Sequence, residues 1–145
     1  MSEHYTNAAH RHLQDSKVLL DAQRWDGSAY LAGYVIECSL KALIVAPSAS
    51  CPQGQSWPGD GHDLNSLEFL LEQMAASRRP GFKRNVSNQL LVAIKSALAG
   101  EPNWHPRMRY ESSGIATEKV ARRWWDIAKR TFGGLAKPFS TEGDQ

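Results

Sequence analysis

The segment Ser28–Val45, SAYLAGYVIECSLKALIV, decides how this chain is expected to fold. Apolar side chains would occupy nearly every side of a helix here, so the sequence predicts a central, enclosed helix. A strand over Tyr34–Leu40 also fits the composition, but the length of the apolar run favours a helix. Gly33 costs about 1 kcal/mol in a helix interior relative to alanine, which suggests that a neighbouring helix or ring passes close to it.

Amphipathic patterns outside this segment predict further helices. Their expected limits are about Thr6–Trp25, from an Asp63 or Asn65 cap to Arg78, about Asn85–Ala99, and from a Thr117 cap to about Phe132. Asp26 is expected to cap the central helix. Long irregular connections are expected at Pro47–Gly61 and Glu101–Ala116, and Gly133 and Gly134 suit the end of the last helix.

These patterns predict one all-α domain over residues 1–145, an antiparallel bundle of four to five helices. Its structured core is expected at about residues 6–134, and the tail from Lys137 is expected to fray. On the last helix, the residues expected to face inward are Val120, Trp124, Ile127, Ala128 and Thr131. Those expected to face mostly outward are Lys119, Arg122, Arg123, Lys129 and Arg130.

The composition is that of an ordinary globular protein, with 41% hydrophobic and 22% charged residues among 145. No apolar run approaches the roughly 20 residues that cross a bilayer, and the first residues lack the pattern of an export signal. A cytoplasmic location without membrane association is therefore expected. Cys38 is expected to be buried and inert, and His10 and His12 stand two apart on a helix, where they do not face each other. This spacing does not suit a pair of metal ligands on a helix, so the sequence predicts no metal site, and it predicts no cofactor.

Charge is unevenly distributed along the chain. Residues through Glu72 include four basic and nine acidic side chains, a net charge of −5, whereas the remainder has 13 basic and six acidic ones, a net charge of +7. A polyanion such as RNA is attracted to a basic surface of this kind through its phosphates. Ordinary solvated helix faces are the alternative explanation.

Glu37 and Lys41 stand one turn apart on the helix that is expected to be buried. A carboxylate removed from water needs a partner, which is Lys41 or else Arg109, with Tyr110 or His62 completing a network. Three interpretations remain open at this point. The first is a buried polar clamp that ties the 101–116 connection to the central helix. The second is a pocket in which Glu37, His62 and Arg109 bind a phosphate or a base. The third is that Glu37 and Lys41 form an exposed ion pair.

The stretch from Ala29 to Ile44, AYLAGYVIECSLKALI, together with the helix expected before it, resembles the opening two helices of HEPN domains. The preceding AHRH at 9–12, the GHDL at 61–64 and the Arg109-Tyr110 pair are similar to the same family. The resemblance implies an all-α bundle of four or five helices that forms a homodimer. It also implies a role in toxin–antitoxin pairs, phage defence or RNA processing, often beside a minimal nucleotidyltransferase.

Many HEPN proteins are metal-independent ribonucleases that carry an Arg followed, four to six residues later, by a His near the start of the last helix. Here the region 107–117 reads RMRYESSGIAT and contains no His. The sequence therefore suggests a catalytically diverged HEPN-like protein that binds RNA, a nucleotide or a partner protein. The residues expected to bind are Arg107, Arg109, Tyr110, Arg122 and Arg123.

Two alternatives to this function remain. One is a metal-independent endoribonuclease or toxin with an atypical site made from Arg109, His105 or His62, and Glu37, in which a His would transfer a proton and an Arg would counter phosphate charge. The other is a purely structural module for protein interaction.

Overall fold

The computed structural model describes residues 4–45, 61–77, 91–92, 94–96, 104, 114 and 116–143, with the backbone alone at 45, 74–77 and 135–143. The helices are α1 (Tyr5–Asp21), α2 (Trp25–Val45), α3 (Leu64–Ser77) and α5 (Glu118–Gly143). Residues 91–92 and 94–96, within the helix expected at Asn85–Ala99, are also helical. These ranges contain no strand, so the all-α prediction is confirmed. None of the described helices is long and apolar enough to cross a membrane.

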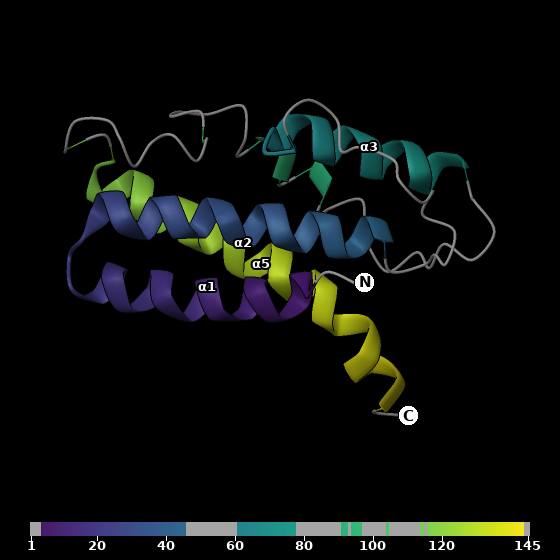
Figure 1. The fold of residues 1–145 in the computed structure, drawn as a ribbon, viewed down its shortest axis with the longest axis horizontal. Coiled ribbons are helices and arrows are strands. Elements are labelled where there is room, and N and C mark those ends of the chain that lie inside the picture. Colours follow the sequence, from purple (N-terminus) through teal and green to yellow (C-terminus); the bar gives the residue numbers. More distant parts are fainter. Residues whose placement is uncertain are drawn as a thin grey trace.

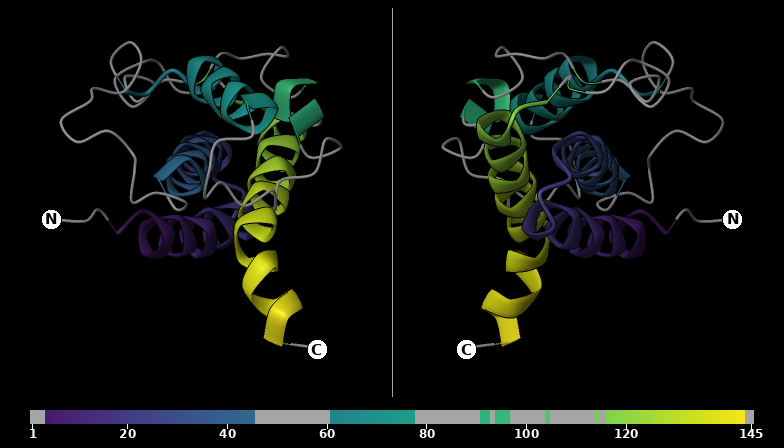
Figure 2. Two further views of the ribbon diagram at one scale, coloured as in Figure 1. Left: turned by 90° about the vertical axis from the view of Figure 1, so that its right-hand side faces the viewer. Right: turned by 90° about the vertical axis from the view of Figure 1, so that its left-hand side faces the viewer.

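Helix α2 lies at the centre of the arrangement. Figure 1 shows α1 and α2 side by side and antiparallel, with α3 on another side of α2, and Figure 2 shows α5 crossing both α1 and α2. Contacts join α2 to α1, α3 and α5, and α1 also contacts α5. Side chains that are fully buried come from several helices: Val35, Ile36, Leu40, Leu67, Leu71 and Ile94. The predicted position of the Ser28–Val45 segment as the most enclosed helix is confirmed.

A tight turn joins α1 to α2. The amide of Arg24 donates to the carbonyl of Leu19 at 2.8 Å, and that of Gln23 donates to Leu20 at 3.0 Å. Gln23 takes a left-handed backbone conformation, with φ of 63°. This pair of bonds with a left-handed residue is the Schellman ending of a helix. It stops α1 at Asp21 rather than at the predicted Trp25, which instead begins α2.

Two serines hold α1 against α2 just beyond this turn. The hydroxyl of Ser16 donates to the carbonyl of Ser28 at 2.8 Å, and the hydroxyl of Ser28 donates to the carbonyl of Ser16 at 2.9 Å. Both residues are fully buried. Because each hydroxyl satisfies a backbone acceptor of the opposite helix, these small side chains allow the two helices to approach closely without an unpaired polar group.

The prediction that Asp26 caps α2 is wrong, because Asp26 lies within the first turn of that helix. Its two carboxylate oxygens accept hydrogen bonds from the amides of Gly114 and Ala116, each at 2.7 Å. Asp26 therefore fixes the segment that leads into α5. The predicted cap Thr117 is confirmed, since its hydroxyl accepts from the amide of Val120 at 3.2 Å. At α3 the cap is Asp63, which accepts from the amide of Asn65 at 3.1 Å.

The end predicted for the last helix is wrong. Helix α5 continues through Gly133 and Gly134 to Gly143, past the predicted end at about Phe132, and the fraying expected from Lys137 stays a prediction. A glycine lowers helix stability by only about 1 kcal/mol and does not oblige a helix to stop. The predicted faces of α5 are confirmed, with the inward residues buried or half-buried and the five basic residues exposed. The far end of α5 extends away from the other helices (Figure 1).

Trp104 explains the glycine in the middle of α2. A Cβ atom built on Gly33 would overlap the indole ring of Trp104. The indole Nε1 donates to the carbonyl of Tyr30 at 2.9 Å, and Trp104 is buried. The close neighbour predicted at Gly33 is therefore this ring, and part of the 101–116 connection packs against α2.

Candidate functional site

Glu37, Lys41 and His62 form a polar cluster between α2 and the start of α3. Lys41 Nζ lies 3.0 Å from Glu37 Oε2, and His62 Nδ1 lies 2.9 Å from Glu37 Oε1. The side chains of Glu37 and Lys41 are only 6% and 8% exposed, whereas that of His62 is 37% exposed. The interpretation of Glu37 and Lys41 as an exposed ion pair is therefore wrong.

Local structure places each member of this cluster. Glu37 and Lys41 are four residues apart on α2, a spacing that puts their side chains on the same face. His62 sits just before α3, between Gly61 and the cap residue Asp63. Gly61 has φ of 84°, a conformation that favours glycine, and this turn presents the imidazole to Glu37.

The ring of Tyr34 lies next to His62 and contacts three further aromatic rings. The ring of Tyr34 stands edge-on to Trp104 at 5.0 Å and to His62 at 6.4 Å between ring centroids. It also stacks on His12 at 5.5 Å and meets Tyr30 edge-on at 5.2 Å. Tyr34 therefore makes ring contacts with three separate parts of the chain: His12 of α1, His62 in the turn before α3, and Trp104 of the 101–116 connection.

Burial shifts the titration of two groups near the cluster, Cys38 and His12. Burial raises the pKa of the Cys38 thiol to about 11, and the negative charge of Glu37 adds to this. Cys38 is buried and free, as predicted, and its thiol stays protonated at neutral pH. Burial and the charge of Arg11 lower the pKa of His12, so that ring favours its neutral form.

The hydrogen bond with Glu37 can hold the His62 ring in one orientation. A carboxylate hydrogen-bonded to one imidazole nitrogen sets the tautomer and orientation of the ring, as in general acid–base sites. The same contacts also serve as a structural clamp between α2 and α3. Three predicted site residues, Glu37, Lys41 and His62, are brought together. Arg107, Arg109, Tyr110 and His105 lie outside the described residues.

The outer side of α5 forms a second candidate region, which we call the basic face: Lys119, Arg122, Arg123, Lys129 and Arg130. Arg122 Nε lies 2.8 Å from Glu118 Oε2, and Arg130 Nε lies 3.2 Å from Asp126 Oδ2. Within the described part of the chain, no carboxylate forms an ion pair with Lys119, Arg123 or Lys129.

Tryptophans lie beside this basic face. Lys129 Nζ stands 5.0 Å from the centroid of the Trp125 ring, and Lys17 Nζ of α1 stands 5.6 Å from it. Trp125 is half-buried at the edge of the packing, whereas Trp124 is in the core, as predicted. At the beginning of α5, the guanidinium of Arg122 lies 5.8 Å from the centroid of the Trp25 ring.

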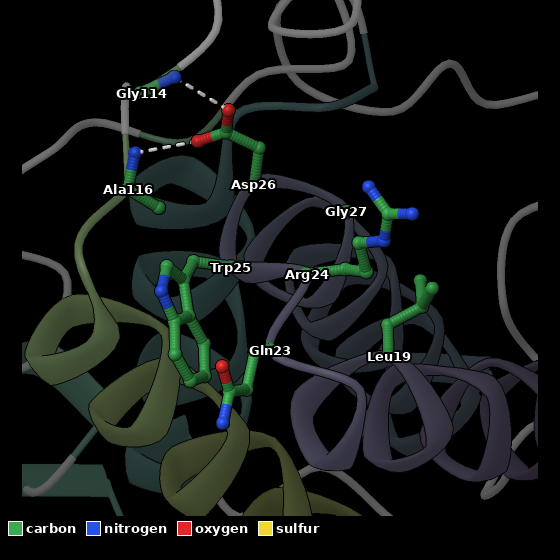
Figure 3. A pocket seen from close by; sticks show the side chains of 8 residues that line it. All are labelled: Leu19, Gln23, Arg24, Trp25, Asp26, Gly27, Gly114 and Ala116. Atoms are coloured by element: carbon green, nitrogen blue, oxygen red, sulfur yellow. Dashed lines mark hydrogen bonds between the residues drawn. The ribbon is translucent and has the colours of Figure 1, made fainter.

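An open hollow of about 510 Å³ lies at the α1–α2 turn, beside the beginning of α5. Figure 3 shows Asp26 hydrogen-bonded to Gly114 and Ala116 at this place, with Arg24 and Trp25 extending to opposite sides. Gln23, the left-handed residue of the turn, also lines it. Sequence reasoning did not find this hollow, because its walls come from segments about 90 residues apart.

Sequence reasoning also missed a pair of carboxyls on α3. Glu68 is 2% exposed, and within the described residues its Oε2 has no hydrogen-bond partner. Burial raises its pKa to about 8, helped by a hydrogen bond to Glu72, so Glu68 holds the proton that the two groups share. Lys95 lies 3.6 Å from Glu72. The sequence did contain a signal for this pair, because Glu68 and Glu72 stand four residues apart among the leucines of α3.

Among the described residues, no group of three or more histidine, cysteine, aspartate or glutamate side chains is arranged to hold a metal ion. Comparisons of the chain with protein-family models, with curated proteins and with solved structures found no match.

Proposed function

We propose that this chain is a catalytically diverged HEPN-like protein that binds RNA through the basic face of α5. The observation that carries the proposal is the exposure of five cationic side chains along one side of that helix, opposite its buried side. Between Glu118 and Arg130, five cations and two carboxylates leave a net charge of +3. Phosphates bind such a surface without reading the base sequence.

The uncompensated cations are the most suitable for phosphate contacts. Arg122 and Arg130 already share their charge with Glu118 and Asp126. Lys119 and Arg123 are exposed and form no ion pair with a described carboxylate, so binding a phosphate costs them no existing salt bridge. Exposed ion pairs are weak in any case, so Arg122 and Arg130 remain able to contribute.

The resemblance to HEPN domains supports the rest of the proposal. It favours a homodimer and a role beside a partner protein, such as a minimal nucleotidyltransferase, in a toxin–antitoxin or defence setting. A nucleotide or the partner itself is the alternative ligand for the same face. The absence of a His from the 107–117 region supports a binding role rather than RNA cleavage.

Fluorescence anisotropy with a labelled single-stranded RNA tests the proposal. With three phosphates neutralised, the logarithm of the association constant should fall with the logarithm of salt concentration with a slope of about −2. The double variant Lys119→Gln/Arg123→Gln removes two of these contacts and should flatten the slope by about 1.4. Lys95→Gln, which removes an exposed cation from another helix, is the control and should leave the slope unchanged. Salt-insensitive binding, or an equal effect of the control, would contradict the proposal.

A second candidate function rests on the hydrogen bond between Glu37 and His62. A histidine oriented by a buried carboxylate suits a metal-independent endoribonuclease with an atypical site. If this activity exists, His62→Ala should abolish cleavage of RNA while leaving the salt-dependent binding by α5 in place. Purified wild-type protein that leaves RNA intact would exclude the activity and retain the clamp.

A further inference from the structure

The hollow at the α1–α2 turn lies next to the basic face of α5 and carries groups that suit a nucleotide. We propose that it takes one unstacked nucleotide of a single-stranded RNA, an inference that rests on the proposed binding of RNA by α5. Its volume of about 510 Å³ falls within the roughly 300–1,000 Å³ of small-molecule pockets.

Arg122 connects the two regions. It belongs to the basic face of α5, and its guanidinium lies 5.8 Å from the centroid of the Trp25 ring, which forms one wall of the hollow. An RNA strand that follows α5 toward its beginning therefore arrives at an aromatic wall. Single-stranded nucleic acids bind proteins by this combination of a cationic track and aromatic side chains.

Gln23 is an unexpected residue for its backbone conformation. It is exposed and has φ of 63° at the end of α1, where glycine is the residue that fits without strain. Strained residues of this kind often mark sites where the side chain is needed. The glutamine amide offers one acceptor and two donor hydrogens at the wall of the hollow, the groups that hydrogen-bond to the edge of a base.

Arg24 and Asp26 complete the site. Arg24 is exposed and extends to the side of the hollow opposite Trp25, where it can reach a phosphate (Figure 3). Asp26 is anchored by the amides of Gly114 and Ala116, so this wall is fixed to the segment that leads into α5. The base is therefore placed near Trp25 and Gln23, and the phosphate near a guanidinium.

The first test is an NMR titration of ¹⁵N-labelled protein with each of the four common nucleoside monophosphates and then with a short single-stranded RNA. Signals of the Trp25 indole and of the Gln23, Arg24 and Gly114 amides should shift together and saturate. The basic face should respond strongly only to the longer RNA. A titration in which the α5 signals shift with RNA while those of the hollow stay in place would overturn the inference and leave the proposed function standing.

Variants provide the second test. Gln23→Gly keeps the left-handed turn, so it should unfold at the same or a higher temperature than wild type yet bind RNA roughly two- to tenfold more weakly, as loss of one hydrogen bond implies. Arg24→Gln should weaken binding by a similar factor. Arg11→Gln, an exposed arginine elsewhere on α1, is the matched control and should bind as wild type does.

The outcomes separate the two proposals. Salt-dependent RNA binding that neither Gln23→Gly nor Arg24→Gln changes refutes the nucleotide site alone. RNA binding that shifts the signals of the hollow but is unchanged in Lys119→Gln/Arg123→Gln refutes the role of α5 alone. If neither RNA nor a mononucleotide shifts any signal, both proposals are wrong.

Discussion

The buried ion pair of Glu37 and Lys41 makes a sharp prediction about stability. Replacing Lys41 with methionine keeps most of the side-chain volume but leaves the Glu37 carboxylate, hydrogen-bonded to His62, in a site where it is only 6% exposed. Charges 3.0 Å apart attract by about 5.5 kcal/mol at an effective permittivity of about 20. Removal of one member of a buried pair is expected to lower the free energy of unfolding by about 3 kcal/mol or more, because the other charge stays buried.

The chain contains a matched control for this experiment. Lys17 and Asp21 form an ion pair of the same spacing at 2.9 Å on α1, but their side chains are 46% and 62% exposed. Lys17→Met should therefore cost less than about 1 kcal/mol. Urea unfolding followed by circular dichroism measures both changes. The double variant Glu37→Leu/Lys41→Met should recover most of the loss, since neither charge remains buried. Equal costs for Lys41→Met and Lys17→Met would refute the reasoning from burial.

Three further predictions concern single residues. Gly33→Ala should lower the free energy of unfolding by about 1–3 kcal/mol despite the better helix propensity of alanine, and tryptophan fluorescence should shift to longer wavelength as Trp104 is displaced. Because Glu68 has a pKa of about 8 in the folded protein against an ordinary 4.5, the folded chain binds this proton more tightly. Stability should fall as pH rises from about 4.5 to 8, and Glu68→Gln should flatten that part of the pH profile of urea unfolding. Cys38 should react with iodoacetamide in the native state no faster than the protein unfolds, since its pKa is raised to about 11; rapid alkylation at neutral pH would contradict its burial.

Local patterns were sufficient to predict the helices that make up the core. The apolar run around Val35 identified α2 as the central helix, and the spacing of Trp124, Ile127 and Ala128 identified the buried side of α5. Gly33 indicated a close neighbour because glycine lowers helix stability relative to alanine, and a position with no room for a Cβ atom explains its presence. In each case, the signal lies within a few turns of one helix, where periodicity reflects burial directly.

Contacts between distant segments could not be predicted in the same way. Asp26 has the residue type of a helix cap, and only the folded chain shows that it binds amides at Gly114 and Ala116. The sequence likewise did not decide whether Glu37 pairs with Lys41 or with Arg109, which is far along the chain. The pKa of Glu68 depends on how deeply α3 packs. The extent of α5 was missed because glycines at 133 and 134 weaken a helix without ending it.

The hydrogen bonds of Ser16 and Asp26 have a consequence for the order of folding. Ser16 and Ser28 are 12 residues apart in sequence, whereas Asp26 and Ala116 are 90 apart. Closing the longer loop in an unfolded chain costs about 2 kcal/mol more entropy, expressed as free energy. We therefore expect the hairpin of α1 and α2 to form first and α5 to dock onto it afterwards. Mutations at Ser16 should slow folding, whereas mutations at Asp26 should mainly speed unfolding.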